Sequence, residues 1–73
     1  MAEPFQMLID TARQWPDPRA VGTWLTAYLG TRPLPAKITA LALLETQVEA
    51  TAPDARVLGL VLRVIEKTRE SLR

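Results

Sequence analysis

The hydrophobic and polar positions of the chain repeat with the period of α-helices. Apolar residues recur every three or four positions, and proline or glycine interrupts this pattern at three places. Such spacing is typical of helices that bury one face. It predicts two short helices at residues 3–14 and 18–29 and two long helices at residues 35–50 and 55–73. We therefore expect residues 1–73 to form a single all-α domain of four helices.

The residues at the interruptions are those that begin and end helices. Asp17 and Pro18 suit the start of the second helix, and Gly30 follows its predicted end. Thr51 is the predicted cap of the last helix, and Asp54 lies in its first turn, where the helix dipole favours negative charge. Because only a few residues separate the two long helices, we expect them to form an antiparallel hairpin.

The last predicted helix carries more apolar surface than one neighbour can cover. It has two adjoining apolar stripes, the first formed by Leu58, Val61, Leu62, Ile65 and Leu72 and the second by Val57, Leu60 and Val64. Together they span roughly 200° of the circumference, about twice the apolar arc of an ordinary surface helix. Either this helix is central in the domain, or its second stripe binds a partner chain. Val57, Leu60 and Val64 are accordingly the first candidates for a protein interface.

Two isolated apolar residues are weaker candidates for an interface. The expected buried faces are formed by Phe5, Leu8, Ile9 and Ala12 in the first helix and by Ile38, Leu41, Leu44 and Val48 in the third. Met7 and Leu43 lie outside these faces. Since single exposed apolar residues are common, simple exposure is the preferred interpretation of Met7.

Trp24 and Tyr28 lie one turn apart in the second predicted helix. Such a pair can form a platform on which a ligand or a base stacks. Aromatic residues at helical spacing in so short a chain are more often part of the core, and we prefer that interpretation.

The small size of the chain favours self-association. A domain of 73 residues buries little core, and the chain has no cysteine for a disulfide. It also has no histidine, so a metal site of His or Cys ligands is excluded. Oligomerisation is the remaining way to stabilise such a domain, and we expect a homodimer. If the dimer uses the stripe completely, Arg32 and the prolines near it are the next candidates for a partner protein.

The residue inventory argues against an enzyme. Without histidine or cysteine, and with Ser71 as the only serine, the common pairs of nucleophile and base cannot form. Glu45 and Glu49 are one turn apart, but such carboxylate pairs usually belong to a solvated helix face. We expect no catalytic residues, no metal and no cofactor.

The near balance of basic and acidic residues argues against nucleic-acid binding without excluding it. Basic residues line one side of the last predicted helix, namely Arg56, Arg63, Lys67 and Arg73. Asp54, Glu66 and Glu70 lie between them, and the whole chain has 9 basic and 8 acidic residues, a net charge of +1. The N-terminal segment is acidic, and no apolar run reaches the roughly 20 residues that span a bilayer. We expect a cytoplasmic protein that does not bind membranes.

Taken together, these patterns predict a non-enzymatic protein-interaction module. We expect a dimeric regulator, adaptor or inhibitor that binds a larger protein through an apolar helical surface. The alternative is a small helical transcriptional regulator that binds nucleic acid.

Overall fold

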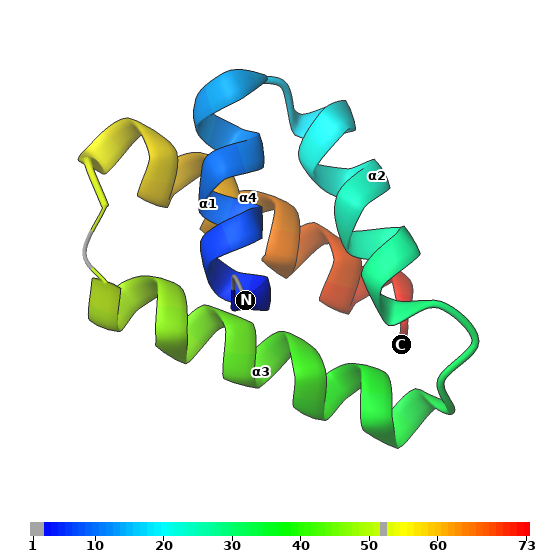
Figure 1. Ribbon diagram of the computed structural model, residues 1–73. Helices are drawn as coiled ribbons and strands as arrows, with labels where there is room; N and C mark the ends of the chain where they lie inside the picture. The colour runs from blue at the N-terminus through cyan, green and yellow to red at the C-terminus, as the bar shows by residue number, and fades with distance from the viewer. Residues whose placement is uncertain (1–2, 52) are drawn as a thin grey trace.

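The computed structural model describes residues 3–51 and 53–73 and contains four helices (Figure 1). Two are short, α1 (Pro4–Gln14) and α2 (Pro18–Leu29), and two are long, α3 (Leu34–Thr51) and α4 (Ala55–Ser71). The described residues contain no β-strand. The predicted all-α fold of two short and two long helices is confirmed.

The helix ends follow the local chemistry of the sequence, with one exception. The side chain of Asp17 accepts a hydrogen bond of 3.0 Å from the backbone N–H of Arg19, and so caps α2. Gly30 ends α2 with φ 56°, a conformation that glycine adopts readily. The prediction that Thr51 caps α4 is wrong, because Asp54 accepts the capping bond from Val57 N–H at 2.9 Å.

Helix α4 lies at the centre of the domain. It packs against α1, α2 and α3, and α1 also packs against α2 and α3. In Figure 1 α4 passes behind α1, and α3 runs along the lower edge of the view. The chain reverses between α3 and α4, and Glu45 of α3 bonds to Arg69 of α4. The two helices therefore run in opposite directions, but the predicted hairpin is only weakly expressed in their packing, because α4 packs more extensively against α1 and α2 than against α3.

All four helices contribute to one apolar core. Fourteen apolar residues of the described chain are buried in it: Leu8, Ile9, Ala12, Val21, Leu25, Leu29, Ala40, Leu41, Leu44, Val48, Val57, Val61, Val64 and Ile65. No polar or charged side chain among the described residues is buried. The folded domain therefore depends on apolar burial with no internal polar network.

Two residues of the predicted interface stripe belong to this core. Val57 and Val64 are only 6% and 5% exposed, so the expectation that they form a free surface is wrong. The reason is the central position of α4, which packs against the other three helices, with α2 beside it at Val64. A Cβ atom placed on Gly22 of α2 would lie 3.9 Å from Val64 Cγ1. Leu60, the third residue of the stripe, is half-buried and packs against the core.

Helix α3 leaves more apolar surface exposed than its sequence pattern predicts. Ile38 was expected in the buried stripe but is 45% exposed. Leu34 and Leu43 are also largely exposed, whereas Leu41, Leu44 and Val48 are buried as predicted. Three of the five large apolar residues that are exposed in the described chain therefore lie on α3, and the other two are Met7 and Trp15.

A candidate protein-binding surface on α1, α2 and α3

The exposed side of α3 is almost free of charge. Ten of the 18 residues of this helix are exposed, and Glu49 is the only charged residue among them. We call these ten residues the α3 face: Leu34, Pro35, Ile38, Thr39, Ala42, Leu43, Thr46, Glu49, Ala50 and Thr51. A solvated helix face normally carries several charges, so the α3 face is unusually apolar for a helix side that is exposed to solvent.

The threonines of the α3 face do not make it polar. Each donates its hydroxyl hydrogen to a backbone carbonyl one turn earlier in the helix, Thr39 to Pro35 at 3.0 Å and Thr46 to Ala42 at 3.1 Å. Thr51 does the same to Gln47 at 2.9 Å. Because these hydroxyl protons are already donated within the helix, burying the face leaves no threonine donor without an acceptor.

Trp24 and Tyr28 form an aromatic pair beside this face. Their rings are stacked, with centroids 5.2 Å apart and an interplanar angle of 10°. Both side chains are half-buried and pack against the core, as the preferred interpretation predicts, but each keeps part of its surface exposed. The Arg32 guanidinium carbon lies 4.8 Å from the centroid of the Tyr28 ring, the geometry of a cation–π interaction.

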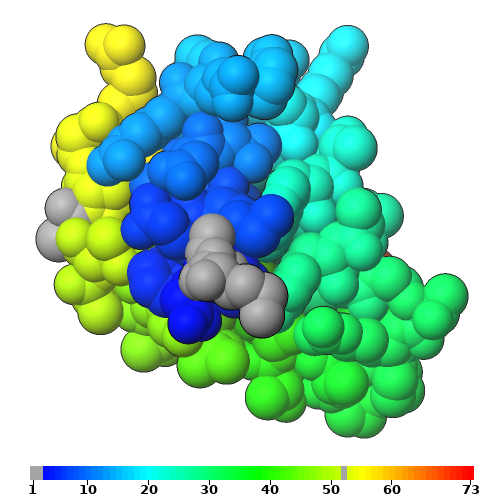
Figure 2. Space-filling view, in the orientation of Figure 1, coloured from blue at the N-terminus to red at the C-terminus, as the bar shows by residue number. Residues whose placement is uncertain are grey.

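Two apolar grooves meet at Tyr28. The first, of about 300 Å³, is lined by Pro4, Met7, Trp24, Ala27 and Tyr28. The second, of about 410 Å³, is lined by Tyr28, Arg32, Pro35, Ala36, Thr39, Ala40 and Leu43. We call the two together the aromatic groove. Figure 2 shows the side of the molecule that α1, α2 and α3 form, with blue α1 between cyan-to-green α2 and green α3.

The aromatic groove contains two of the five interface residues predicted from the sequence. Met7 is 47% exposed in the first groove and Leu43 is 56% exposed in the second. The fold thus brings the two weaker candidates to one surface and leaves Val57, Leu60 and Val64 outside it.

Sequence reasoning missed the role of the aromatic pair in this surface. Trp24 lines the first part of the groove and Tyr28 lines both. The sequence signal that could have indicated it is Arg32, a cation four residues after Tyr28, beyond the glycine that ends α2.

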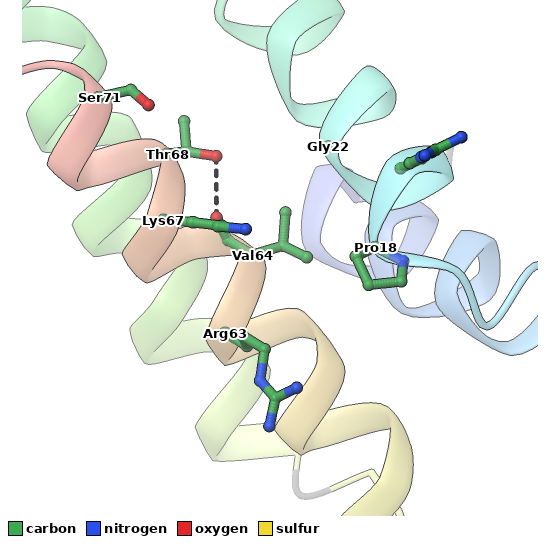
Figure 3. Close-up of a pocket in the computed structure, with 8 residues that line it drawn as sticks. Pro18, Gly22, Arg63, Val64, Lys67, Thr68 and Ser71 are labelled. Atoms are coloured by element: carbon green, nitrogen blue, oxygen red, sulfur yellow. Dashed lines mark hydrogen bonds between the residues drawn. The ribbon is translucent and has the colours of Figure 1, made fainter.

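A second, chemically different groove lies between α2 and α4 (Figure 3). It measures about 450 Å³ and is lined by Pro18, Arg19, Gly22, Arg63, Val64, Lys67, Thr68 and Ser71. Lys67 and Val64 project from α4 toward α2 in this view. Among the residues that the structure describes, no carboxylate oxygen lies within 4.0 Å of a side-chain nitrogen of Arg19, Arg63 or Lys67. We call this the basic groove; Arg56 and Arg73, the other two cations predicted on this side, do not line it.

The carboxylates do not assemble into a chemical site in the described part of the chain. Glu45 accepts a hydrogen bond from Arg69, and this bond raises the pKa of the Arg69 guanidinium above its usual value. Arg69 also bonds to Glu66 of α4 at 3.4 Å. Arg69 thus links α4, to which it belongs, with α3. Glu49 is exposed, and residues 3–51 and 53–73 contain no group of three potential metal ligands.

Comparison of the chain with models of protein families, with curated proteins and with solved structures found no match. Within the described residues no helix has both the length and the hydropathy needed to cross a bilayer. The surfaces of this domain are therefore the basis for its functional interpretation.

Proposed function

We propose that this domain is a non-enzymatic protein-interaction module, a dimeric regulator, adaptor or inhibitor that binds a larger protein through the aromatic groove. The observation that carries this proposal is the pair of apolar grooves that share Tyr28. Half-exposed aromatic residues provide large contact areas at low cost in side-chain entropy, and interfaces are enriched in tryptophan, tyrosine and arginine. All three residue types occur together here, as Trp24, Tyr28 and Arg32.

The shape and charge of the aromatic groove indicate what it binds. A partner helix with apolar side chains one turn apart would place one of them in each part of the groove. Arg32 lies at the end of the groove near α3, so an acidic residue on the partner would pair with it. We infer that the partner segment is an amphipathic helix with apolar anchors and at least one acidic residue.

A peptide selection tests this function. Helical peptides from a display library are selected on the wild-type domain and titrated against a Trp15→Phe variant, in which Trp24 is the only tryptophan and its fluorescence reports on the groove. We expect the selected peptides to carry apolar residues at helical spacing and an acidic residue, and to change Trp24 emission.

Two charge variants provide the matched comparison. Met7→Asp introduces a charge inside the groove, whereas Ala55→Asp introduces the same charge at an exposed position of α4 outside it. The first should weaken peptide binding at least about tenfold, since a charge is buried without a partner, and the second should have little effect. Equal binding to both variants would disprove the aromatic groove as the binding site.

The basic groove supports a second candidate function, binding of nucleic acid. Arg19 adds a cation from α2 to the two cations, Arg63 and Lys67, predicted from α4. A gel-shift titration with random duplex DNA at low and moderate salt tests this function. If it holds, affinity falls steeply with salt, and Lys67→Ala lowers both the affinity and the salt slope. No shift at low salt would exclude it.

A further inference from the structure

The basic groove is one part of a longer crevice between α2 and α4. A cavity of about 690 Å³ shares Arg19, Gly22 and Thr68 with the basic groove, and a cavity of about 210 Å³ shares Thr68 and Ser71 with it. Thr68 lines all three cavities, so they are continuous, and we call them together the α2–α4 crevice. Figure 3 views the basic groove, with α4 on one side of it and α2 on the other.

Positive charge is concentrated in the α2–α4 crevice. Among the described residues, four cations and no carboxylate line it, namely Arg19, Lys37, Arg63 and Lys67. No carboxylate oxygen in this part of the chain lies within 4.0 Å of a side-chain nitrogen of these four. The other five basic residues and the eight acidic residues of the sequence carry a net charge of −3. The crevice is therefore complementary to an anionic ligand, although the whole chain is nearly neutral.

The threonine hydroxyls in the crevice present hydrogen-bond acceptors. Thr68 donates its hydroxyl hydrogen to the Val64 carbonyl at 2.8 Å, and Thr26 donates to the Gly22 carbonyl at 2.9 Å. Each hydroxyl proton is thus used within its own helix, and oxygen lone pairs remain for a ligand. The best ligand combines negative charges with hydrogen-bond donors. An acidic peptide has both, as carboxylate side chains and backbone N–H groups.

A DNA strand fits the crevice less well than an acidic peptide. Its sugar–phosphate backbone has no hydrogen-bond donor for the threonine oxygens. No aromatic side chain among the described residues lines the crevice, so the bases would lack a stacking surface. The net charge of −3 outside the crevice would also repel a polyanion that extends beyond it.

We propose that the α2–α4 crevice binds an extended acidic segment of the partner protein, with carboxylates at alternate positions. The inference rests on the proposed protein-interaction function and adds a second contact to it. Arg63 and Lys67 are four residues apart in α4, about 6 Å along the helix axis. Alternate side chains of an extended strand are roughly 7 Å apart on one face, close to this spacing. From Arg63 to Leu72 the crevice is about 14 Å long, the length of about four or five extended residues.

One partner can contact the crevice and the aromatic groove together, because the two lie on either side of α2. Ala27 lines both the first part of the aromatic groove and the cavity of about 690 Å³. A helix with its side chains is about 10 Å wide, and about three extended residues cover this distance. A short connection therefore suffices between a partner helix in the aromatic groove and an acidic segment in the crevice.

An NMR titration with acetylated and amidated hexaglutamate tests binding to the crevice. The chain has three glycines, of which Gly22 and Gly30 line the crevice and Gly59 does not. In the ¹⁵N-labelled domain we expect the amide signals of Gly22 and Gly30 to shift and that of Gly59 to stay in place. Hexaglutamine, the neutral control, should shift none of them. No shift at millimolar hexaglutamate, or an equal shift of Gly59, would overturn the proposal.

Two charge variants of α4 test the location of the peptide. Lys67→Gln should weaken hexaglutamate binding about fivefold or more, because a cation that lines the crevice is lost. Arg56→Gln removes the same charge from an exposed position about 16 Å away along the axis, beyond the Debye length of roughly 10 Å at 0.1 M salt. It should have little effect. Equal losses in both variants would show that the peptide is attracted to α4 in general, contrary to the proposal. Circular dichroism confirms that the variants are folded.

The Met7→Asp variant separates this inference from the aromatic groove. Met7 lines the aromatic groove and not the crevice, so hexaglutamate should bind this variant as it binds the wild type. This result would support the crevice even if no helical peptide binds the aromatic groove. Loss of hexaglutamate binding in Met7→Asp would instead assign the acidic peptide to the aromatic groove and contradict the crevice.

Two comparisons of ligands test the class and the spacing of the anion. Hexathymidylate has a similar charge and should bind less tightly than hexaglutamate; tighter binding would assign the crevice to nucleic acid instead. A pentapeptide with glutamates alternating with alanines should bind about threefold tighter than its isomer with three consecutive glutamates, since only alternate side chains share one face. Equal affinities of the two isomers would refute the extended, alternating arrangement.

Discussion

The two long helices, α3 and α4, have similar lengths and similar numbers of large apolar residues, yet they present different surfaces. Of the 17 residues of α4, eight are exposed and five of those are charged. Of the 18 residues of α3, ten are exposed and one is charged. The difference shows that the width of an apolar arc does not decide whether it is exposed. The number of neighbours around the helix decides it.

The neighbours of each helix explain the contrast. α4 packs against all three other helices, so even an apolar arc of roughly 200° is covered. α3 packs against α1 and α4 and has only weak contact with α2. Leu34, Ile38 and Leu43 consequently remain exposed.

The largest expected effect comes from introducing a charged residue into each of the two helices. Val64→Asp places an unpaired carboxylate in the core beside Gly22 and should destabilise the domain by about 4 kcal/mol or more. Leu43→Asp on α3 should remain folded. Urea denaturation followed by circular dichroism measures both. A folded Val64→Asp variant with the wild-type midpoint would show that this side of α4 is a surface.

Truncation of two leucines in α3 separates its buried side from its exposed side. Leu41 is fully buried, so Leu41→Ala should lower the free energy of unfolding by about 2–5 kcal/mol. Leu43→Ala should change the unfolding free energy of the monomer by about 0.5 kcal/mol or less. The measurement is urea denaturation at a protein concentration below the dimer dissociation constant. Similar losses in both variants would contradict the assignment of the two sides.

Substitution of Gly59 tests whether the charged side of α4 faces water. A Cβ atom on Gly59 would have no neighbour within 4 Å, and the residue is exposed within the helix. Gly59→Ala should therefore stabilise the domain by about 1 kcal/mol, because alanine loses less backbone entropy in a helix. Thermal unfolding should show a higher midpoint. A lower midpoint would indicate that a partner packs on this side.

The smallest effect concerns the ion pair between Glu45 of α3 and Arg69 of α4. A double-mutant cycle with Glu45→Gln and Arg69→Met should give a coupling of about 0.5 kcal/mol, since solvent reaches both side chains. The Arg69 pKa is raised in the folded state, so its contribution is lost only as the pH rises through that raised value. Stability from this guanidinium should not change between about pH 6 and 9. A titration in that range attributable to Arg69 would contradict this.

Much of the fold could be predicted from the sequence because local chemistry determines it. Asp17, Gly30 and the apolar spacing define helices to within two residues of the observed bounds. The position of the exposed surface could not be predicted, because it depends on which helices enclose α4. Met7 and Leu43 were identified by lying off their helical stripes, a local property. Their approach to a common groove at Tyr28 depends on how α1, α2 and α3 are arranged in space.

Tyr28 lines both halves of the aromatic groove. Its ring stacks against Trp24, and the Arg32 guanidinium lies over it. A ligand that displaces this ring to widen one half must narrow the other. The two halves are therefore thermodynamically linked: an anchor that enters deeply on the Met7 side should oppose one on the Leu43 side. Partners with unequal anchors, one bulky and one small, should consequently be preferred over partners with two large ones.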